Sequence, residues 1–256
     1  MVTKKLAIPD EWSETIIAFE SPYKLRELSI PREEPREIRE SAVEQQKFKI
    51  RLANTEERRD SASLLIQKRY SWRGYETGGA LEKTPNKITL LAFGGDQIAG
   101  TLTLGLDSPE GLLVDDLYKT EIDTLRVAGH KVFELTKLAV DQHIRSKRVL
   151  ASLFHIAALV YGRSIFGYTD VVIEVNPRHT LFYKKMLGFH QLGGEKICTR
   201  VDAPAVLLRL ELDYADLQVK KFGGQMEKAK AEKSLYPYFF TKIDEIGITN
   251  RLLQNN

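Results

Sequence analysis

The residue whose type and setting best suit chemistry is Glu134, a lone carboxylate within the apolar run Val132–Val140. Burial raises the pKa of a carboxyl group, because the charged form loses its hydration, and makes it a better proton acceptor near neutral pH. We therefore expect Glu134 to be a general base. The alternative is a structural ion pair with Lys137 or a nearby arginine. Glu134 and Lys137 fall on opposite faces of a strand, which disfavours the local pair.

Glu134 lies in a stretch where predicted strands and helices alternate. Val132–Val140 and Asp170–Val175 are short and rich in β-branched and aromatic residues, so we expect buried strands. Between them, apolar residues recur at intervals of three and four and predict a helix: Val149, Leu150, Leu153, Ile156, Ala157, Val160 and Tyr161. This order predicts a β-α-β crossover in an α/β fold, followed by a helix that carries Tyr183.

Three regions are expected along the chain: a polar extension at residues 1–48, a core domain at residues 49–212, and a helical tail at residues 213–256 packed on that domain. The extension is expected to hold one helix, Glu34–Gln46, and to pack loosely. Other expected elements are a strand at Phe48–Ala53, a helix from Thr55 to about Tyr70, a hairpin of Lys87–Phe93 and Ile98–Leu106, a helix at Val114–Arg126, and a hairpin of Lys196–Val201 and Ala205–Leu212.

Composition limits the classes of function. A chain of 256 residues with 43% hydrophobic and 29% charged residues is ordinary for a soluble protein with a sizeable core. It has no apolar run of about twenty residues, so we expect no membrane span. Its start lacks the apolar core of a secretory signal, which favours a cytoplasmic location. One cysteine and five scattered histidines predict no metal site, and a net charge of +3 does not indicate nucleic-acid binding.

The order of these motifs resembles the Gcn5-related N-acyltransferase (GNAT) superfamily. The resemblance rests on Leu138-Ala139-Val140 before a basic turn and a helix, and on Asn176, Phe182-Tyr183 and Gly188-Phe189 after the next strand. It implies a mixed central sheet flanked by helices, in which two strands splay apart and hold an acyl thioester in the gap.

The same resemblance implies roles for individual residues. The pantetheine arm would pair with the backbone of Leu138, Ala139 and Val140, and a backbone N–H near Leu138 or Ala139 would hold the oxyanion. Glu134 matches the general base of the family. Tyr183 would stand near the departing sulfur and could protonate it. The alternative for Tyr183 is core packing beside neighbouring phenylalanines.

The turn before the central helix departs from the pattern of members that use acetyl-CoA. In those members, two small residues let backbone N–H groups close around a pyrophosphate. This chain has Arg148 and Leu150 at those positions, and their Cβ atoms would crowd that approach. We therefore expect no bound cofactor and a donor that is acyl-phosphopantetheine on acyl carrier protein. Arg145, Lys147 and Arg148 would attract an acidic carrier protein; the alternative is that they are solvated residues at a helix start.

Among superfamily members that use acyl carrier protein, the chain is most similar to the N-acyl amino acid synthases of the FeeM type, from about Arg69 to Leu253. The motifs include Gly100–Leu104, Asp107-Ser108 with Gly111-Leu112, Glu134–Val140, Asn176–His179, Ala203–Val206 and Ser234–Pro237. The related acyl-homoserine-lactone synthases have Glu-x-Ser-Arg where this chain has Glu-Leu-Thr-Lys, which disfavours lactone synthesis. The resemblance implies transfer of a fatty acyl group to the α-amine of an amino acid. An acyl-CoA-dependent enzyme and a non-catalytic binding domain are the alternatives.

Several residues are candidates for contact with the substrates. Arg69, Arg73 and Arg178 suit the carboxylate of the acceptor, since a planar guanidinium matches it with two hydrogen bonds. Trp72 could wall the acceptor or acyl pocket, and Thr101 is placed with the substrate-binding residues. His179 either caps a helix or lines the site. The alternative for the arginines and Trp72 is an ordinary surface loop.

Overall fold

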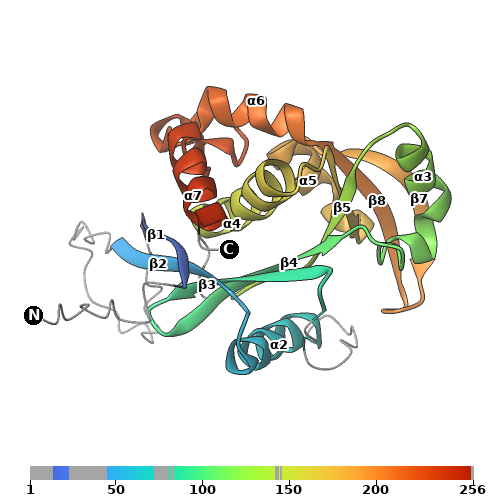
Figure 1. Ribbon diagram of the computed structural model, residues 1–256, viewed down its shortest axis with the longest axis horizontal. Coiled ribbons are helices and arrows are strands. Elements are labelled where there is room, and N and C mark those ends of the chain that lie inside the picture. The colour runs from blue at the N-terminus through green and yellow to red at the C-terminus, as the bar shows by residue number, and fades with distance from the viewer. Residues whose placement is uncertain are drawn as a thin grey trace, which may run out of the picture.

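One eight-stranded mixed sheet forms the centre of the computed structural model, which describes residues 14–22, 45–71, 81, 84–141, 144 and 146–254 (Figure 1). The strands are β1 (Thr15–Pro22), β2 (Gln45–Leu52), β3 (Lys87–Gly94), β4 (Gln97–Leu106), β5 (Val132–Val140), β6 (Asp170–Val175), β7 (His190–Cys198) and β8 (Ala203–Glu211). Their order across the sheet is β1-β2-β3-β4-β5-β6-β8-β7. β5 and β6 run parallel, and the other neighbours are antiparallel.

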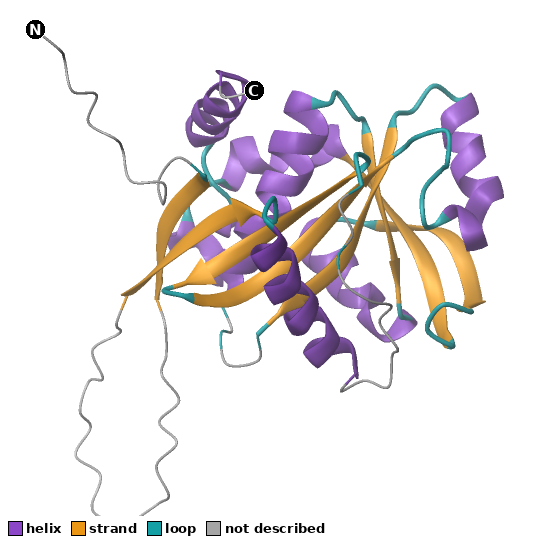
Figure 2. Cartoon of the chain, turned by 60° about the horizontal axis from the view of Figure 1, so that its bottom comes forward, coloured by secondary structure: helices purple, strands orange, loops and turns teal. Residues whose placement is uncertain are grey.

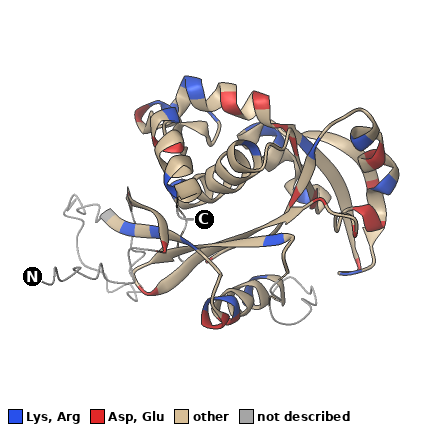
Figure 3. Cartoon of the chain, viewed as in Figure 1, with Lys and Arg blue, Asp and Glu red and all other residues tan. Residues whose placement is uncertain are grey.

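Helices cover both faces of this sheet (Figure 2). α2 (Glu56–Ser71) and α3 (Asp115–Val127) pack on one face. The other face carries α4 (Lys147–Phe154), the π-helix η1 (His155–Ile165), α5 (Thr180–Leu187), α6 (Leu212–Phe222) and α7 (Lys242–Gln254), together with the short 3-10 segments η2 (Pro177–His179), η3 (Met226–Lys230) and η4 (Tyr236–Tyr238). Basic and acidic residues both occur along α2, α3, α6 and α7 (Figure 3). No described helix has the length and apolar character needed to cross a bilayer.

Local sequence signals account for most of these elements. Thr55 begins α2 by accepting a hydrogen bond from the N–H of Arg58 at 3.4 Å. Gly95 has a φ of +61° in the turn between β3 and β4, and Gly129 has a φ of +86° just after α3. The strands predicted at Val132–Val140 and Asp170–Val175 are confirmed at those bounds.

The two central strands separate partway along their length. β5 and β6 pair only through Val132 to Glu134, opposite Asp170 to Val172. Beyond that point the facing edges of the strands carry no β5–β6 pairing. This confirms the expected splay in a mixed sheet flanked by helices.

A β-bulge in β5 lies within the splayed segment. Thr103 pairs with Thr136 and Thr101 pairs with Ala139, so Lys137 and Leu138 together oppose one residue of β4. Lys137 has a left-handed φ of +52°, a conformation that costs a non-glycine residue roughly 1–2 kcal/mol. The hydroxyl of Thr101 donates to the carbonyl oxygen of Lys137 at 2.8 Å and so holds the bulge from β4.

The N-terminal extension differs from the expectation in one respect. Thr15–Pro22 forms β1, which pairs antiparallel with β2 and buries Ile16 and Phe19. Gln45 and Gln46, expected at the end of a helix, begin β2 instead. The rest of the helix expected at Glu34–Gln46 lies outside the described residues. A short strand flanked by polar sequence gives too few alternating residues to be recognised before its partner strand is known.

The central helix is longer and less regular than its apolar pattern indicates. The predicted face is largely buried, but the α-helix ends at Phe154 and continues as a π-helix from His155. π-helical segments are frequent at functional sites. An apolar stripe over a few turns looks much the same in an α-helix and in a π-helix, so the sequence pattern does not distinguish them.

Candidate active site

A cavity of about 360 Å³ opens where β5 and β6 separate. Its walls come from Glu134–Leu138 of β5, Ile173–Val175 of β6, Ser63, Ile66 and Tyr70 of α2, and Phe154 of α4. Asn176, His179 and Tyr183 close it on the side of α5. The splay therefore creates an apolar space that reaches both helical layers of the fold.

Glu134 lies in the wall of this cavity with only 2% of its surface exposed. One carboxylate oxygen accepts a hydrogen bond from the N–H of Leu113 at 3.0 Å, and the other accepts from the N–H of Val114 at 3.1 Å. Burial raises the pKa of Glu134 to about 7, although these two N–H groups and the positive charges of Lys87 and Arg200 lower it in part. The carboxyl group can thus accept a proton near neutral pH.

The backbone of β4 leaves room for this carboxylate. Gly105 pairs with Glu134 across the sheet. A Cβ atom at Gly105 would lie 2.6 Å from the Oε1 atom of Glu134, closer than van der Waals contact allows. Glycine at this position is therefore a condition for the observed placement of the carboxylate.

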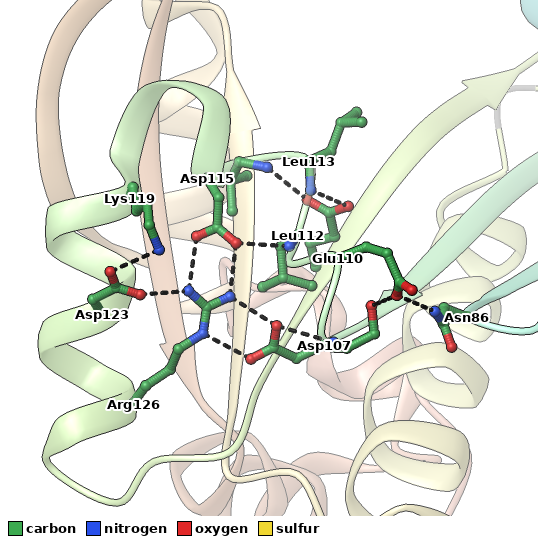
Figure 4. A network of polar contacts seen from close by, with 12 residues as sticks. Asn86, Asp107, Glu110, Leu112, Leu113, Asp115, Lys119, Asp123 and Arg126 are labelled. Atoms are coloured by element: carbon green, nitrogen blue, oxygen red, sulfur yellow. Dashed lines mark hydrogen bonds and ion pairs between the residues drawn. The ribbon is translucent and has the colours of Figure 1, made fainter.

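An arginine-centred network holds the loop that supplies the two N–H groups (Figure 4). Arg126 of α3 donates to Asp107 at 2.7 and 2.8 Å, to Asp115 at 2.7 and 3.0 Å, and to Asp123 at 2.7 Å. Asp115 also accepts from the N–H of Leu112 at 2.7 Å. The network joins both ends of the loop to α3, so it fixes the N–H groups that face Glu134.

Tyr183, the expected proton donor, and His179, an expected substrate contact, both line the cavity. The ring of Tyr183 also packs edge-on against Phe154 and Phe189, with centroids 6.4 and 5.9 Å apart. The two roles expected for Tyr183, a place beside the departing sulfur and packing in the core, are therefore compatible. His179 occupies the N-cap position of α5, but its side chain makes no capping hydrogen bond there. The side chain of Asn176 caps the preceding segment η2 by accepting from the N–H of Arg178 at 3.2 Å.

Of the other predicted substrate contacts, Leu138 lines the cavity and several described residues do not. The cavity reaches Leu138 but not Ala139 or Val140. Thr101 is fully buried and its hydroxyl binds the bulge, so its structural role replaces the predicted contact. Arg69 is half-buried on α2, and its neighbour Tyr70 faces the cavity instead, with its hydroxyl 3.5 Å from the carbonyl oxygen of Leu138. Arg178 is exposed beside the cavity rim and donates to His179 at 3.2 Å. Trp72, Arg73 and Arg145 lie outside the described residues.

Arg148 contacts the C-terminal segment of the chain. It donates to the carbonyl oxygens of Tyr238 and Phe239, and its guanidinium lies 4.7 Å from the ring centroid of Phe240. Burial lowers the pKa of this guanidinium. Arg148 is therefore neither a solvated residue nor a free surface charge, which corrects its assignment to carrier-protein contact. Lys147 is exposed.

The side chain of Ser146 caps the start of α4. Ser146 accepts a hydrogen bond from the N–H of Val149 at 3.2 Å, and its hydroxyl lies 2.7 Å from the hydroxyl of Ser21 on β1. The N–H of Leu150 donates to the carbonyl oxygen of Ser146 at 3.3 Å. Two of the N–H groups at this end of the helix thus bind within the chain.

Three polar residues of the cavity wall were not predicted. Arg200 donates to Glu174 at 2.7 and 2.8 Å and to Asp116 at 2.7 Å. Cys198 is buried beside them, and burial raises the pKa of its thiol. Glu174 belongs to β6, whereas Cys198 ends β7 and Arg200 follows it. Only the pairing of β7 with β8, and of β8 with β6, brings Cys198 and Arg200 to Glu174. The sequence feature that could have pointed to this part of the cavity is the motif Ala203–Val206, part of which also lines it.

Comparison with known proteins places this arrangement in a family. Residues 61–211, more than half of the chain, match the family described as N-acyl amino acid synthase FeeM. No curated protein matches the chain. The solved structure of FeeM, an N-acyl amino acid synthase from uncultured soil microbes, is 26% identical, with a TM-score of 0.58 over 66% of this chain and 97% of that chain.

Two further solved structures are more distant. A probable acetyltransferase from Staphylococcus epidermidis is 18% identical, with a TM-score of 0.47 over 64% of this chain and 98% of that one. The AHL synthase LasI is 12% identical, with a TM-score of 0.44 over 64% of this chain and 90% of that one. By its family match, the chain belongs to the FeeM family of N-acyl amino acid synthases, has the GNAT fold, and is an N-acyltransferase.

Proposed function

We propose that the protein transfers a fatty acyl group from the thioester of acyl carrier protein to the α-amine of an amino acid, which gives an N-acyl amino acid. The observation that carries this proposal is the position of Glu134. It is a buried carboxyl group with a pKa near 7, and it lies in the wall of an apolar cavity at the strand splay. A base of that pKa suits removal of a proton from an ammonium.

The reaction can be written with these residues. Glu134 takes one proton from the ammonium, and the free amine attacks the thioester carbonyl. As the tetrahedral intermediate collapses, the C–N bond is kept, the C–S bond breaks, and the second proton of the amine passes to the departing thiolate. A backbone N–H on the splayed edge of β5 would hold the oxyanion, because that edge has no partner in β6 beyond Glu134. A thiol has a pKa of about 8.5, so the thiolate leaves readily and a proton from Tyr183 gives only modest assistance.

The start of α4 supports a carrier-tethered donor. A coenzyme A pyrophosphate binds best where backbone N–H groups are open and small residues allow a close approach. In this chain, the side chain of Ser146 caps the N–H of Val149 and contacts Ser21, and Arg148 and Leu150 carry bulky side chains there. A phosphopantetheine arm has no such requirement. Lys147 remains exposed and is the described residue that we assign to contact with an acidic carrier protein.

Donor competition tests the proposal. The same fatty acyl group is supplied on acyl carrier protein and on coenzyme A, with a mixture of amino acids, and the amides are measured by mass spectrometry. We expect a kcat/KM at least about tenfold higher with the carrier protein, which corresponds to about 1.4 kcal/mol of added contacts. Equal values would contradict the donor assignment. No amide from either donor would contradict the function.

A charge reversal tests the carrier-protein surface separately. Lys147→Glu should raise the KM for acyl carrier protein and leave the KM for a small acyl-pantetheine thioester unchanged, since only the protein carries an acidic surface. Lys131→Glu is the matched control, because Lys131 is exposed and directly precedes β5, at the opposite end of that strand from the turn to α4. An equal effect of the two variants would contradict the assignment.

A further inference from the structure

Arg200 joins three parts of the fold beside Glu134. It follows β7, and its guanidinium donates to both carboxylate oxygens of Glu174 on β6, at 2.7 and 2.8 Å. It also donates to Asp116 of α3 at 2.7 Å, and to the carbonyl oxygen of Leu113, in the loop before α3, at 3.1 Å. A residue of the β7–β8 hairpin therefore holds the loop that supplies N–H groups to Glu134.

The peptide group between Leu113 and Val114 connects Arg200 to Glu134. A trans peptide is planar, and its C=O and N–H point in opposite directions. The carbonyl oxygen of this peptide accepts from Arg200 at 3.1 Å, and from the N–H of Asp116 at 3.4 Å. Its N–H, which belongs to Val114, donates to Glu134 at 3.1 Å. A cation on the carbonyl oxygen polarises the peptide group, so it strengthens the N–H as a donor to the carboxylate.

Glu174 offsets part of the positive charge of Arg200. Glu134 pairs with Val172 across the sheet, so Glu174, two residues further along β6, lies on the same face as Glu134. The side chain of Glu174 is only 14% exposed, and both of its oxygens bind Arg200. Two charge-assisted hydrogen bonds of this kind fix the orientation of a guanidinium. Arg200 and Glu174 therefore form one charge pair beside Glu134.

Other titratable groups surround the same carboxyl group. Besides the Arg200–Glu174 pair, those in the cavity wall are Lys137, His179, Tyr183 and Cys198. On the side of β3, Glu134 also borders a second cavity, which is lined by Lys87, Glu110 and Asp116. Burial raises the pKa of Glu134, and the positive charges of Lys87 and Arg200 lower it in part. Arg200 acts in a second way as well, because it binds the peptide that donates to Glu134.

We propose that Arg200 is a positioning residue for the general base: it holds the Leu113–Val114 peptide with its N–H toward Glu134, and Glu174 offsets part of its charge. This inference rests on the proposed function, in which Glu134 is the base. Loss of Arg200 removes a cation and loosens the peptide, and both effects disfavour the ionised carboxylate. Loss of the charge on Glu174 removes an anion and leaves Arg200 less compensated, which favours the ionised carboxylate. The two changes should therefore move the pKa of Glu134 in opposite directions.

The experiment compares the pH–rate profiles of Arg200→Gln, Glu174→Gln and the wild-type enzyme. We expect the midpoint of the rise in kcat/KM to move up by about half a pH unit or more in Arg200→Gln, which lowers kcat/KM about threefold on the acid side, and to move down in Glu174→Gln. Lys196→Gln is the matched control and should leave the midpoint in place. Lys196 also reaches from β7 to α3, where it donates to the carbonyl oxygen of Leu117 at 2.7 Å and to Glu121 at 3.1 Å, but it does not line the cavity.

Carbon NMR of protein with carboxyl-labelled glutamate follows the titration of Glu134 directly, and Glu134→Gln identifies its signal. This measurement separates the inference from the function on which it rests. Opposite shifts of the pKa in the two variants support the inference even if no amide forms, in which case the proposed function alone fails. Amide formation with a wild-type midpoint in Arg200→Gln overturns the inference and leaves the function in place.

The direction of the shift also separates positioning from a merely structural role. Shifts of the same sign in Arg200→Gln and Glu174→Gln overturn the inference, because loosening of the loop alone would raise the pKa of Glu134 in both variants. If Arg200→Gln does not fold, Glu174→Gln carries the test by itself: a lowered pKa supports the inference, and an unchanged or raised pKa overturns it. An unshifted pKa in folded variants together with no amide overturns both the inference and the function.

Discussion

At the scale of single residues, the chemistry centres on the protonation of Glu134. Burial raises the pKa of its carboxyl group to about 7. As a general base it must be ionised, so kcat/KM should rise as pH increases through about 7 and level off above it. Glu134→Gln should lower kcat by about 10²–10⁴-fold, the usual contribution of general base catalysis. A pH–rate profile of the wild-type enzyme and a single-turnover measurement of the variant check both statements.

The stability of the same variant provides the control. A glutamine side chain can accept from only one of the two N–H groups of Leu113 and Val114, so the variant should lose about 1 kcal/mol at low pH. A carboxyl group whose pKa is raised on folding stabilises the fold below its unfolded pKa, and this contribution disappears as pH rises through about 7. A glutamine side chain does not titrate, so the difference in free energy of unfolding between the wild-type protein and Glu134→Gln should shrink or reverse above pH 7. A well-folded Glu134→Gln variant with wild-type kcat would remove the catalytic assignment.

Residue types and spacing identified some site residues and misplaced others, for physical reasons. Glu134 stands out because a single carboxylate in an apolar strand needs a special environment. Arg148 and Thr101 do not differ from surface or substrate-binding residues in the sequence, since their partners, at Tyr238 and at Lys137, are set by tertiary packing. Arg200 reaches the cavity only through strand pairing, which no local pattern encodes.

At the scale of elements, the loop between β4 and α3 links a helix to the base. Arg126 bonds Asp107 and Asp115 at the two ends of this loop. Arg126→Gln should loosen it and weaken the hydrogen bonds from Leu113 and Val114 to Glu134. Those bonds favour the ionised carboxylate, so their loss should raise the pKa of Glu134 and move the rise of kcat/KM to higher pH.

The control for this prediction is Lys119→Gln on the same helix. Lys119 is exposed and pairs at 2.8 Å with Asp123, the partner of Arg126 that does not lie at an end of the loop, so its loss should leave the pH–rate profile in place. Asp107→Asn is a milder second change, because it weakens the contact of Arg126 with one end of the loop. An unchanged midpoint in both Arg126→Gln and Asp107→Asn, with each variant folded, would show that the loop does not tune the base.

The elements around the site were largely predictable, because their signals are local. Caps, turn glycines and the short β-branched runs define α2, the β3–β4 hairpin, β5 and β6. The bulge at Lys137 and the π-helix from His155 were not predictable, since both depend on how the elements pack. β1 was missed for a similar reason, as its burial depends on β2 and on the C-terminal segment.

At the scale of the whole molecule, the C-terminal segment is tied to the layer that carries the cavity. Arg148 binds Tyr238 and Phe239, and Arg251 of α7 donates to the carbonyl oxygen of Ile16 on β1. His155 of η1 packs against Phe239 and Phe240 with centroids 5.4 Å apart. His155 follows Phe154, which lines the cavity. A change that loosens the C-terminal segment should therefore also disturb the cavity at the splay.

A buried polar cluster makes that attachment sensitive to acid. The Nε2 atom of His155 lies 3.3 Å from a carboxylate oxygen of Glu245 on α7, and both side chains are almost fully buried. Lys242 binds Glu245 and Asp216. Burial lowers the pKa of His155. The pKa of Glu245 is also lowered, because its contacts with His155 and Lys242 outweigh burial, which acts to raise it.

Groups whose pKa is lowered on folding stabilise the protein above their unfolded pKa, and this contribution disappears as pH falls. For histidine the unfolded value is about 6.5 and for glutamate about 4.3, so His155 acts first. We expect the free energy of unfolding to fall below pH 6.5 by up to about 1.4 kcal/mol per pH unit, because the unfolded chain then binds a proton at His155 that the folded protein does not. His155→Phe should remove most of that slope between pH 6.5 and 5, whereas His190→Gln, at an exposed position, should not. Urea unfolding of the three proteins at several pH values measures the slopes. An equal slope in wild type and His155→Phe would mean that other groups govern acid sensitivity, and that the attachment of α7 to η1 does not depend on a neutral histidine.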